Sequence, residues 1–395
     1  MAASVSFAAT LMAQSGTNAP ASQKPLPKAT ETMVVLGTAE PVPLAESNTA
    51  VAVLPVAQLE SVQVSAQDLL REDSAVYLEE RGAGGGQADI ILRGGTAEQT
   101  LVLVNGFRVN DAQTGHHNLD LPLPLGGMSA VEVLHGAGST LHGTDALSGV
   151  VEFLTAAPSH DGMQLRAGGG SYGETEQALE GSLVRRNWSG RLTAERNFST
   201  GFMTDRDYRN EDAAAESWLG TRLGVSDLLV AGSDRSFGAN QFYGNYSSWE
   251  RTKSWFTGLR QELGPQTVAA FGYRIHTDEF VLLRSMPAVY TNNHKDSSWQ
   301  ASLRRTESFA RRGAVVLYGL ESDGDAIEST NYAGGVTTNA LGNHARNRGA
   351  GYADLDLRPS KSRWSLSLGA REEIFSGGRA VFRPIWLAAF AWPMG

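Results

Sequence analysis

The sequence of 395 residues contains no cysteine, which excludes a disulfide-stapled scaffold and any zinc site with cysteine ligands. Basic residues are also in deficit. There are 33 Lys and Arg against 42 Asp and Glu, and the resulting net charge of −9 argues against a non-specific nucleic-acid binder. Long apolar runs are missing too. A transmembrane helix needs roughly 20 mostly apolar residues, and the longest comparable run, Pro384 to Trp392, is far shorter.

The chain is rich instead in glycine, with 44 residues, and 41% of its residues are hydrophobic. That apolar content is too high for a disordered chain. Only 19% of the residues are charged and 8% are aromatic. Together with the lack of helical spans, this composition indicates a β-rich protein, either a soluble sandwich or an outer-membrane barrel.

The first thirty residues read as a leader and a tether. Met1 to Ala13 is small and apolar, and it resembles the apolar part of a secretory signal cleaved near Ala13 and Gln14. The positively charged start of such a signal is missing, since the first lysine is Lys24. Export is favoured over a plain disordered N-terminus. Residues 14–30 are rich in Pro, Ser, Ala and Lys, which predicts a flexible linker.

The segment Glu31 to Gly37, with the sequence ETMVVLG, is β-prone and follows the linker directly. One interpretation is the first strand of the next domain. The other is a segment that adds to the sheet edge of another protein, where main-chain hydrogen bonds give the affinity. Four apolar residues alone do not decide between the two.

A small mixed α/β domain is predicted for residues 40–158. Strands are expected at 88–95, 131–134 and 149–155, and helices at 65–71 and 140–147. Residues 100–109 predict a β-hairpin, because Asn105-Gly106 suits the two positive-φ positions of a type I′ turn.

Three blocks of this domain resemble the plug domain of TonB-dependent outer-membrane receptors. They are Ile91 to Gly94 (ILRG), Thr100 to Asp111 (TLVLVNGFRVND) and Val131 to Thr155 (VEVLHGAGSTLHGTDALSGVVEFLT), in the order and spacing of the family. One departure is His135, which stands where the family usually has arginine. The residues that carry the resemblance are Arg93, Gly94, Asn105, Gly106, Arg108, Glu132, Gly136, Gly143 and Gly149.

The resemblance implies a function. The segment before the domain would be the TonB box, with Thr32, Met33, Val34, Val35 and Leu36 binding TonB of the inner-membrane energising complex. The protein would be a receptor in the outer membrane of a Gram-negative bacterium, in contact with its lipid. It would import a scarce small molecule of the cobalamin or iron-siderophore class, and it would be neither an enzyme nor a nucleic-acid binder. A receptor that also signals to a periplasmic regulator is disfavoured, because only the short linker precedes the box.

Residues 159–395 alternate apolar and polar side chains, as in Trp299 to Arg304 and Trp364 to Arg371. Such alternation with aromatic residues at strand ends is typical of transmembrane barrel strands. We expect about twelve antiparallel strands of an incomplete transmembrane β-barrel. The expected short connections are periplasmic, and the long ones are extracellular. The long ones are 201–212, 239–248, 283–295 and 325–347.

Three local patterns allow other chemistry. Gly169 to Gly173 matches the Gly-x-Ser-x-Gly elbow of hydrolases, but alternating strand follows it, so a barrel turn is favoured. His116 and His117 are predicted either to lie in a solvated loop or to face the extracellular cavity and contact substrate. Asp205, Asp207, Glu211 and Asp212 are candidate calcium ligands in an outer loop, since closely spaced oxygen ligands suit calcium.

Length sharpens the functional prediction. The family resemblance implies a 22-stranded barrel, and at roughly 20 residues per strand and connection that barrel needs about 440 residues. Far fewer follow the plug-like domain here. We therefore expect an N-terminal part of a receptor, and the alternative to an uptake receptor is a truncated, non-transporting remnant.

Overall fold

The computed structural model describes residues 33–34, 36, 42–44, 47, 49–59, 63–309, 311, 313–359 and 364–390. All of them belong to one unit that spans Thr32–Gly395. The predicted leader and linker lie outside the described residues, as do Thr32, Val35 and Gly37 of the predicted TonB box. Within the described ranges, no helix combines the length and the apolar character needed to cross a membrane.

The N-terminal domain is built on a five-stranded sheet of order β3-β8-β9-β6-β7, in which only β6 and β9 pair in parallel. Every residue of β6 is buried, as expected for a strand covered on both faces. A second sheet pairs β4 with β5. The bounds are β3 Val51–Pro55, α1 Val56–Leu59, α2 Ala66–Leu70, β4 Val76–Glu80, β5 Ala88–Leu92, β6 Thr100–Val104, β7 Phe107–Arg108, β8 Ala130–His135, α3 Ser139–His142 and β9 Gly149–Leu154, with single 3₁₀ turns at Ala97–Gln99, Gly115–His117 and Leu125–Gly127.

The elements predicted for this domain are present, and two of them are shorter than predicted: the strand expected at 88–95 ends at Leu92 and the helix expected at 140–147 ends at His142. The helix expected at 65–71 is α2, and the Ser65 side chain caps it by accepting a hydrogen bond from the Asp68 amide. The β6–β7 hairpin turns at Asn105 (φ +50°) and Gly106 (φ +82°), as a type I′ turn requires. The second helix, α3, ends at His142 because Gly143 adopts a φ of +89°.

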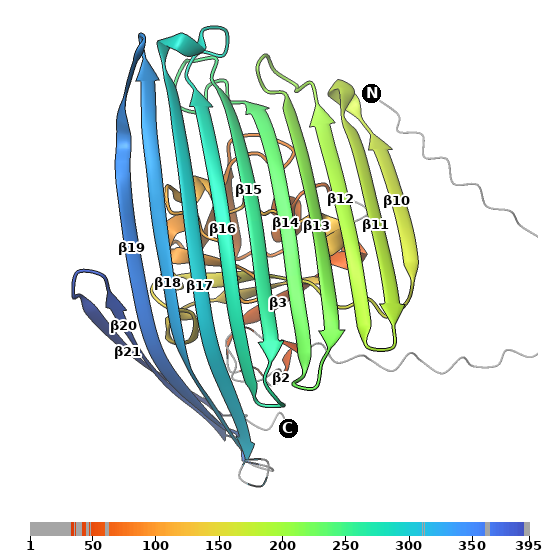
Figure 1. The fold of residues 1–395 in the computed structure, drawn as a ribbon, viewed down its shortest axis with the longest axis vertical. Coiled ribbons are helices and arrows are strands. Elements are labelled where there is room, and N and C mark those ends of the chain that lie inside the picture. Colours follow the sequence, from red (N-terminus) through yellow and green to blue (C-terminus); the bar gives the residue numbers. More distant parts are fainter. Residues whose placement is uncertain are drawn as a thin grey trace, which may run out of the picture. The chain divides into compact units, whose positions relative to one another are not determined.

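A twelve-stranded antiparallel sheet follows, in which every strand pairs with its neighbour in the sequence (Figure 1). Among the described residues, its edge strands β10 and β21 do not pair with each other. The expected count of about twelve strands is therefore confirmed, and so is the expectation that the sheet is not a closed barrel. The bounds are β10 Gly162–Gly169, β11 Thr175–Arg185, β12 Trp188–Ser199, β13 Tyr208–Gly220, β14 Val225–Gly238, β15 Trp249–Glu262, β16 Thr267–Val281, β17 Thr291–Phe309, β18 Ala314–Ala333, β19 Val336–Leu357, β20 Trp364–Phe375 and β21 Ala380–Phe390.

Three of the four predicted long connections are wrong in extent. The segment 325–347 is not a loop, because β18 and β19 run through it and turn only at Gly334-Gly335. Likewise β13 begins at Tyr208 and β17 at Thr291, inside segments expected to be loops. These strand ends are mostly polar, with scattered residues such as Tyr208, Ile327 and Val336, so their sequences lack the regular alternation that marks a half-buried strand. The Gly-x-Ser-x-Gly match is a turn between β10 and β11, as favoured.

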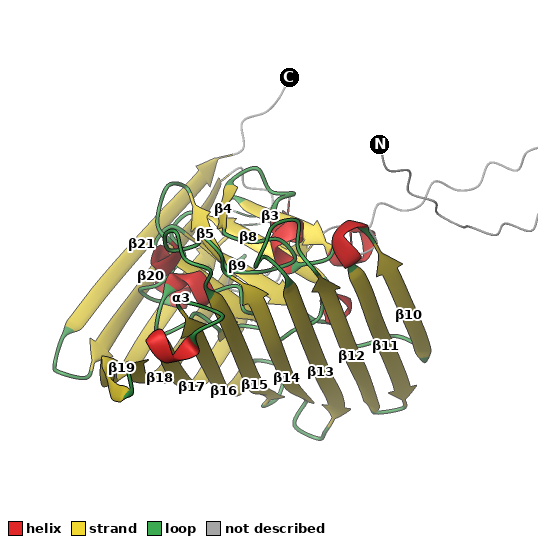
Figure 2. Ribbon diagram, turned by 90° about the horizontal axis from the view of Figure 1, so that it is seen from above, coloured by secondary structure: helices red, strands yellow, loops and turns green. Residues whose placement is uncertain are grey.

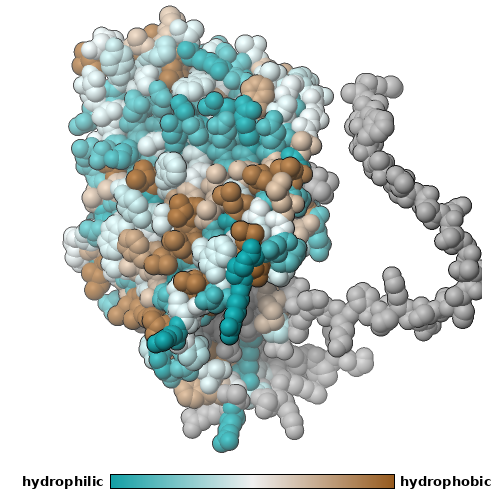
Figure 3. All heavy atoms as spheres, turned by 45° about the vertical axis from the view of Figure 1, so that its right-hand side comes forward, coloured by the Kyte–Doolittle hydropathy of each residue, from teal (hydrophilic) through white to brown (hydrophobic). Residues whose placement is uncertain are grey.

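The N-terminal domain lies on the concave side of the sheet (Figure 2). On the surface shown in Figure 3, hydrophobic side chains gather below a hydrophilic upper zone. The exposed apolar side chains of the sheet include Leu228, Val230 and Leu259, whereas nearer the long loops Asp234 pairs with Arg251 at 2.6 Å. The sheet thus has an apolar belt for a lipid core, and its strands extend beyond that belt into a charged zone.

Candidate functional site at the interface of domain and sheet

The hairpin β6–β7 is seated on the sheet by one aromatic ring. Phe107 is 3% exposed and meets Phe256 of β15 edge to face, with ring centroids 5.6 Å apart. Its ring also lies against Gly258 and Gly272, which are cross-strand partners in β15 and β16. A Cβ atom at either glycine would stand 2.7 Å from the ring, so this close approach depends on two residues without side chains.

The neighbouring residue, Arg108, joins the domain to the sheet through charge. Its Nε lies 2.9 Å from Asp145 of the same domain, and its Nη1 lies 3.3 Å from Asp325 of β18. Its backbone N–H and C=O each form a 2.9 Å hydrogen bond with the Gln300 side chain of β17. Burial raises the pKa of the Asp145 carboxyl, but the nearby Arg108, Arg348 and Arg346 together outweigh burial and the pKa is lowered, so the Asp145–Arg108 pair is ionised.

The end of α3 forms a second contact with the sheet. Arg371 of β20 donates to the Leu141 carbonyl at 3.3 Å, and Arg348 of β19 donates to Thr144 Oγ1 at 2.9 Å. At Gly143, a Cβ would lie 2.5 Å from an oxygen of Glu373. Burial, with Arg371 nearby, lowers the pKa of His142 to about 4, so this histidine is neutral.

Asn105 holds the other side of the hairpin. Its Nδ2 donates to Thr155 Oγ1 at 2.7 Å and to Glu216 Oε1 of β13 at 3.1 Å, while its Oδ1 accepts from the Thr155 amide at 2.9 Å. An aspartate would also fit this turn, but it would have no donor for Glu216. Asn105 therefore connects the hairpin to Thr155 and Glu216 in addition to fitting the turn.

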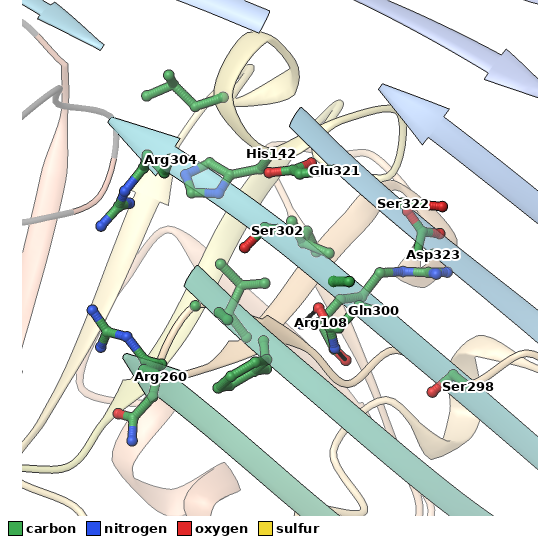
Figure 4. Close-up of a pocket in the computed structure, with 18 of the residues that line it drawn as sticks. Arg108, His142, Arg260, Ser298, Gln300, Ser302, Arg304, Glu321, Ser322 and Asp323 are labelled. Atoms are coloured by element: carbon green, nitrogen blue, oxygen red, sulfur yellow. Dashed lines mark hydrogen bonds between the residues drawn. The ribbon is translucent and has the colours of Figure 1, made fainter. Parts of the chain in front are cut away.

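A cavity of about 330 Å³ lies beside the hairpin, between the N-terminal domain and strands β15–β19 (Figure 4). Its lining joins residues of β6, β7 and α3 to the inner face of the sheet. The side chains labelled in Figure 4 are polar, whereas other lining residues, such as Leu101, Leu141 and Leu317, are apolar, so the cavity has a mixed lining. The labelled lining residues are Arg108, His142, Arg260, Ser298, Gln300, Ser302, Arg304, Glu321, Ser322 and Asp323.

The described part of the predicted TonB box is attached to the domain. The strand β1 Met33–Val34 pairs with β2 Val42–Pro43. Leu36 is fully buried, and its N–H donates to Glu132 Oε2 of β8 at 2.8 Å. Glu132 is the cross-strand partner of Glu152 in β9. Burial, followed by the Glu132 charge, raises the pKa of Glu152 to about 7.

Comparison with known proteins identifies these parts. The family described as the TonB-dependent receptor plug domain matches residues 43–150. The vitamin B12 transporter BtuB of Vibrio vulnificus strain CMCP6 is 32% identical over 151 residues, which cover 37% of this chain and 24% of that protein. The BtuB of Photobacterium profundum is 28% identical over 187 residues, which cover 44% of this chain and 30% of that protein. The matched regions therefore span only about a quarter to a third of these relatives.

Solved structures agree with the fold. The unliganded ferric citrate transporter FecA has a TM-score of 0.65 at 16% identity, covering 87% of this chain and 60% of that one. The pyoverdine-bound FpvA of P. aeruginosa has a TM-score of 0.70 at 14% identity, covering 92% and 57%. Residues 43–150 thus match the plug domain of TonB-dependent receptors. The fold as a whole is that of these solved receptors, so the N-terminal domain is called the plug and the twelve-stranded sheet the wall.

The plug motif residues have structural roles in this arrangement. Arg93 (φ +48°) and Gly94 (φ +72°) form the turn after β5. Gly149 stands against Leu92 and the Leu134 carbonyl, leaving no room for a side chain. Gly136 has a φ of +123°. His135 faces Asp73 within the plug, at 2.6 Å, and not the wall.

The two candidate substrate histidines lie in the 3₁₀ turn Gly115–His117. His116 Nδ1 is 2.5 Å from Asp89 Oδ1 of the plug. His117 is 2% exposed and packs against His276 of the wall, with ring centroids 5.0 Å apart. The solvated-loop interpretation is therefore wrong for His117, whereas substrate contact by this turn stays a prediction.

The four candidate calcium ligands are not brought together. Asp205 and Asp207 both face Arg284, whose Nη2 is 2.9 Å from Asp207 Oδ2. Asp212 lies inside β13 and pairs with Arg235 at 3.2 Å, while Glu211 pairs with Arg196 at 3.1 Å. The outer loop ends before β13, so only Asp205 and Asp207 retain the expected position, and calcium binding there stays a prediction.

Sequence reasoning missed the ionic contacts of the wall, including Arg348, Arg371 and Glu373. A signal for them exists. On the inner face of β20, alternate residues Ser367, Gly369, Arg371 and Glu373 are buried. In a barrel that encloses a plug, charged residues at alternate positions mark the plug-facing side of the strand.

Proposed function

We propose that this chain acts in TonB-dependent uptake of a small nutrient across the outer membrane. The observation that carries the proposal is the connection between the TonB-box segment at Leu36 and the β6–β7 hairpin that contacts the wall. Leu36 is hydrogen-bonded to β8, β8 pairs with β9, and β9 pairs in parallel with β6. The β6–β7 hairpin then contacts the wall through Phe107 and Arg108. A pull on the box thus has a short hydrogen-bonded path to the plug–wall interface.

The substrate class we propose is cobalamin or an iron–siderophore complex. The relatives that match the plug are named vitamin B12 transporters, and the solved structures include receptors named for ferric citrate and siderophores. The proposed partner is TonB, bound through residues 32–36. No covalent bond of the substrate changes in this process, so no catalytic residue is assigned.

The test is uptake by the full chain in a Gram-negative strain that lacks its own receptors. Labelled cobalamin and a small panel of ferric chelates would be offered to the cells. Deleting residues 31–37 should abolish uptake but leave surface binding unchanged, because the box couples energy and does not form the substrate site. A matched control deletes seven linker residues, 17–23, and should transport normally. Uptake that survives loss of the box would refute the coupling role.

One observation favours a second candidate, a protein that does not transport. The described wall leaves β10 and β21 as edges, and unpaired strand edges are not stable against lipid. A chain that neither binds nor imports any member of the panel, although it is present in the outer membrane, would support this candidate.

A further inference from the structure

A cluster of titratable side chains lies where the plug loop 111–121 meets strands β15–β17 of the wall, near their loop-side ends. Its members come from the plug loop and from strands β15, β16 and β17, and they are buried from solvent. The Asp111 side chain is fully buried, and the other six residues are at most 5% exposed. The members are Asp111, His117 and Asp120 of the plug and Glu250, His276, Asp278 and Asp296 of the wall.

Asp120 stands between two imidazole rings at the centre of this cluster. Its Oδ2 is 3.2 Å from His117 Nδ1 and 3.2 Å from His276 Nε2. The three atoms all lie within 4.8 Å of one another. Zinc bonds to nitrogen and oxygen are about 2.0–2.2 Å long, and a tetrahedron of such bonds separates its ligands by roughly 3.3 Å. The observed spacing of donor atoms therefore fits one metal ion.

The outer nitrogen of each imidazole faces a carboxylate. His276 Nδ1 is 2.8 Å from Asp111 Oδ2. His117 Nε2 is 3.7 Å from Asp278 Oδ2 and 3.8 Å from Glu250 Oε1. Metal-bound histidines nearly always have such a partner, which fixes the ring and increases its basicity. In this structure a carboxylate lies near the outer nitrogen of each ring, although His276 Nδ1 has no hydrogen-bond partner among the described residues and the His117 contacts are longer than a hydrogen bond.

An independent observation concerns Asp296, the cross-strand partner of His276, which is 2% exposed. Neither of its oxygens has a hydrogen-bond partner of ordinary geometry among the described residues, and its carboxyl lies beside that of Asp111. Its Oδ2 points to His276 Nδ1 from 4.0 Å. The cluster holds five carboxylates, and the guanidinium groups that pair with them are Arg235 and Arg274, the first also shared with Asp212. The two imidazoles also face these five carboxylates. Because a buried carboxylate without a compensating charge is costly, either protons or a bound cation must compensate the cluster.

We propose that His117, Asp120 and His276 bind one divalent transition-metal ion of the zinc class, with Asp111 and Asp278 orienting the two imidazoles. Two nitrogen ligands favour such an ion over calcium or magnesium, which prefer oxygen. Two ligands come from the plug and one from β16, so the ion cross-links the plug loop to the wall. This site is separate from the proposed uptake function and does not depend on it.

The experiment measures metal binding by the purified full chain in detergent. The protein is stripped with a chelator and then dialysed against Zn²⁺, and bound zinc is counted per chain. We expect one ion per chain. Loss of an outer carboxylate typically weakens a metal site about 10–100-fold, which is the range expected for Asp111→Asn. His117→Gln and His276→Gln each remove a ligand and should weaken binding by at least about 100-fold.

His344→Gln is the matched control, because His344 is exposed on β19 and far along the chain from the cluster. Tryptophan fluorescence of the wall checks that each variant is folded. A second readout uses unmutated protein: Co²⁺ in a four-coordinate nitrogen and oxygen site gives a visible absorption band that octahedral aqueous Co²⁺ nearly lacks. Absence of both the zinc ion and the cobalt band from the folded wild-type protein would overturn the proposal. So would unchanged zinc affinity in folded His117→Gln and His276→Gln, since protons would then satisfy the cluster.

Discussion

Replacing Phe107 by alanine is predicted to destabilise the contact between the β6–β7 hairpin of the plug and strands β15 and β16 of the wall. The ring is 3% exposed and fills the space above Gly258 and Gly272, where no side chain takes its place. Truncation of a buried phenylalanine to alanine costs about 3–5 kcal/mol. Each 1.4 kcal/mol is tenfold in an equilibrium constant, so the open form of the hairpin should become at least about 100-fold more populated.

The assay is amide hydrogen exchange of the full chain, read from a peptide that covers β6 and β7. Exchange of such amides follows local opening, and tryptophan fluorescence does not replace it, since all eight tryptophans lie at or after Trp188. Phe271→Ala is the matched control. Phe271 is next to Gly272 but 50% exposed on the other face of β16, and its loss should leave plug exchange unchanged. Equal exchange rates of the β6–β7 peptide in wild type and Phe107→Ala would refute the claim that Phe107 holds the hairpin against the wall.

Three further predictions concern the same interface. Gly272→Ala places a Cβ 2.7 Å from the Phe107 ring, so it should speed exchange of the β6–β7 peptide in the same direction. Asn105→Asp removes the donor to Glu216 and sets two carboxylates together, and it should destabilise the hairpin by about 1–3 kcal/mol in the same exchange assay. Glu152 has its pKa raised from 4.5 to about 7 in the folded plug. The contribution of protonated Glu152 to the stability of the folded plug is therefore complete below pH 4.5 and is lost as the pH rises through about 7. The loss of stability over this range is about 3 kcal/mol. Exchange of β9, corrected for intrinsic rates, should lose this pH dependence in Glu152→Gln.

The plug was predictable from the sequence because local rules and the fold agree there. Asn105-Gly106 and the Ser65 cap are signals that act within a few residues, and both appear as predicted. The wall was predictable in strand number but not in strand length. Above the apolar belt both faces of a strand meet water or polar groups, so alternation disappears while pairing continues, as in β18 and β19.

The interface was the least predictable part, and the reason is the inner face of the wall. The inward residues Arg274, His276 and Asp278 alternate with outward ones, which a sequence reading takes as ordinary polar lining of a barrel. Their partners His117 and Asp120 lie more than 150 positions away, on a plug loop whose own residues suggest solvent exposure. Only the folded plug shows which wall residues are covered.

Because the plug covers these wall residues, their charged groups are no longer hydrated. A polar residue facing a water-filled lumen is stable alone, whereas the same residue under a plug must be paired or must bind a cation. Arg108 meets this demand with Asp145 and Asp325, and the metal ion proposed here would meet it for the histidine cluster. Any movement that opens a path between plug and wall has to break such contacts or rehydrate them. The apolar contact of Phe107 resists that movement without needing a partner charge. Because Phe107 and Arg108 are adjacent on one hairpin, its opening breaks both contacts together. Only the ionic part is screened, and weakly because the pairs are buried, so exchange of the β6–β7 peptide should accelerate only slightly with ionic strength.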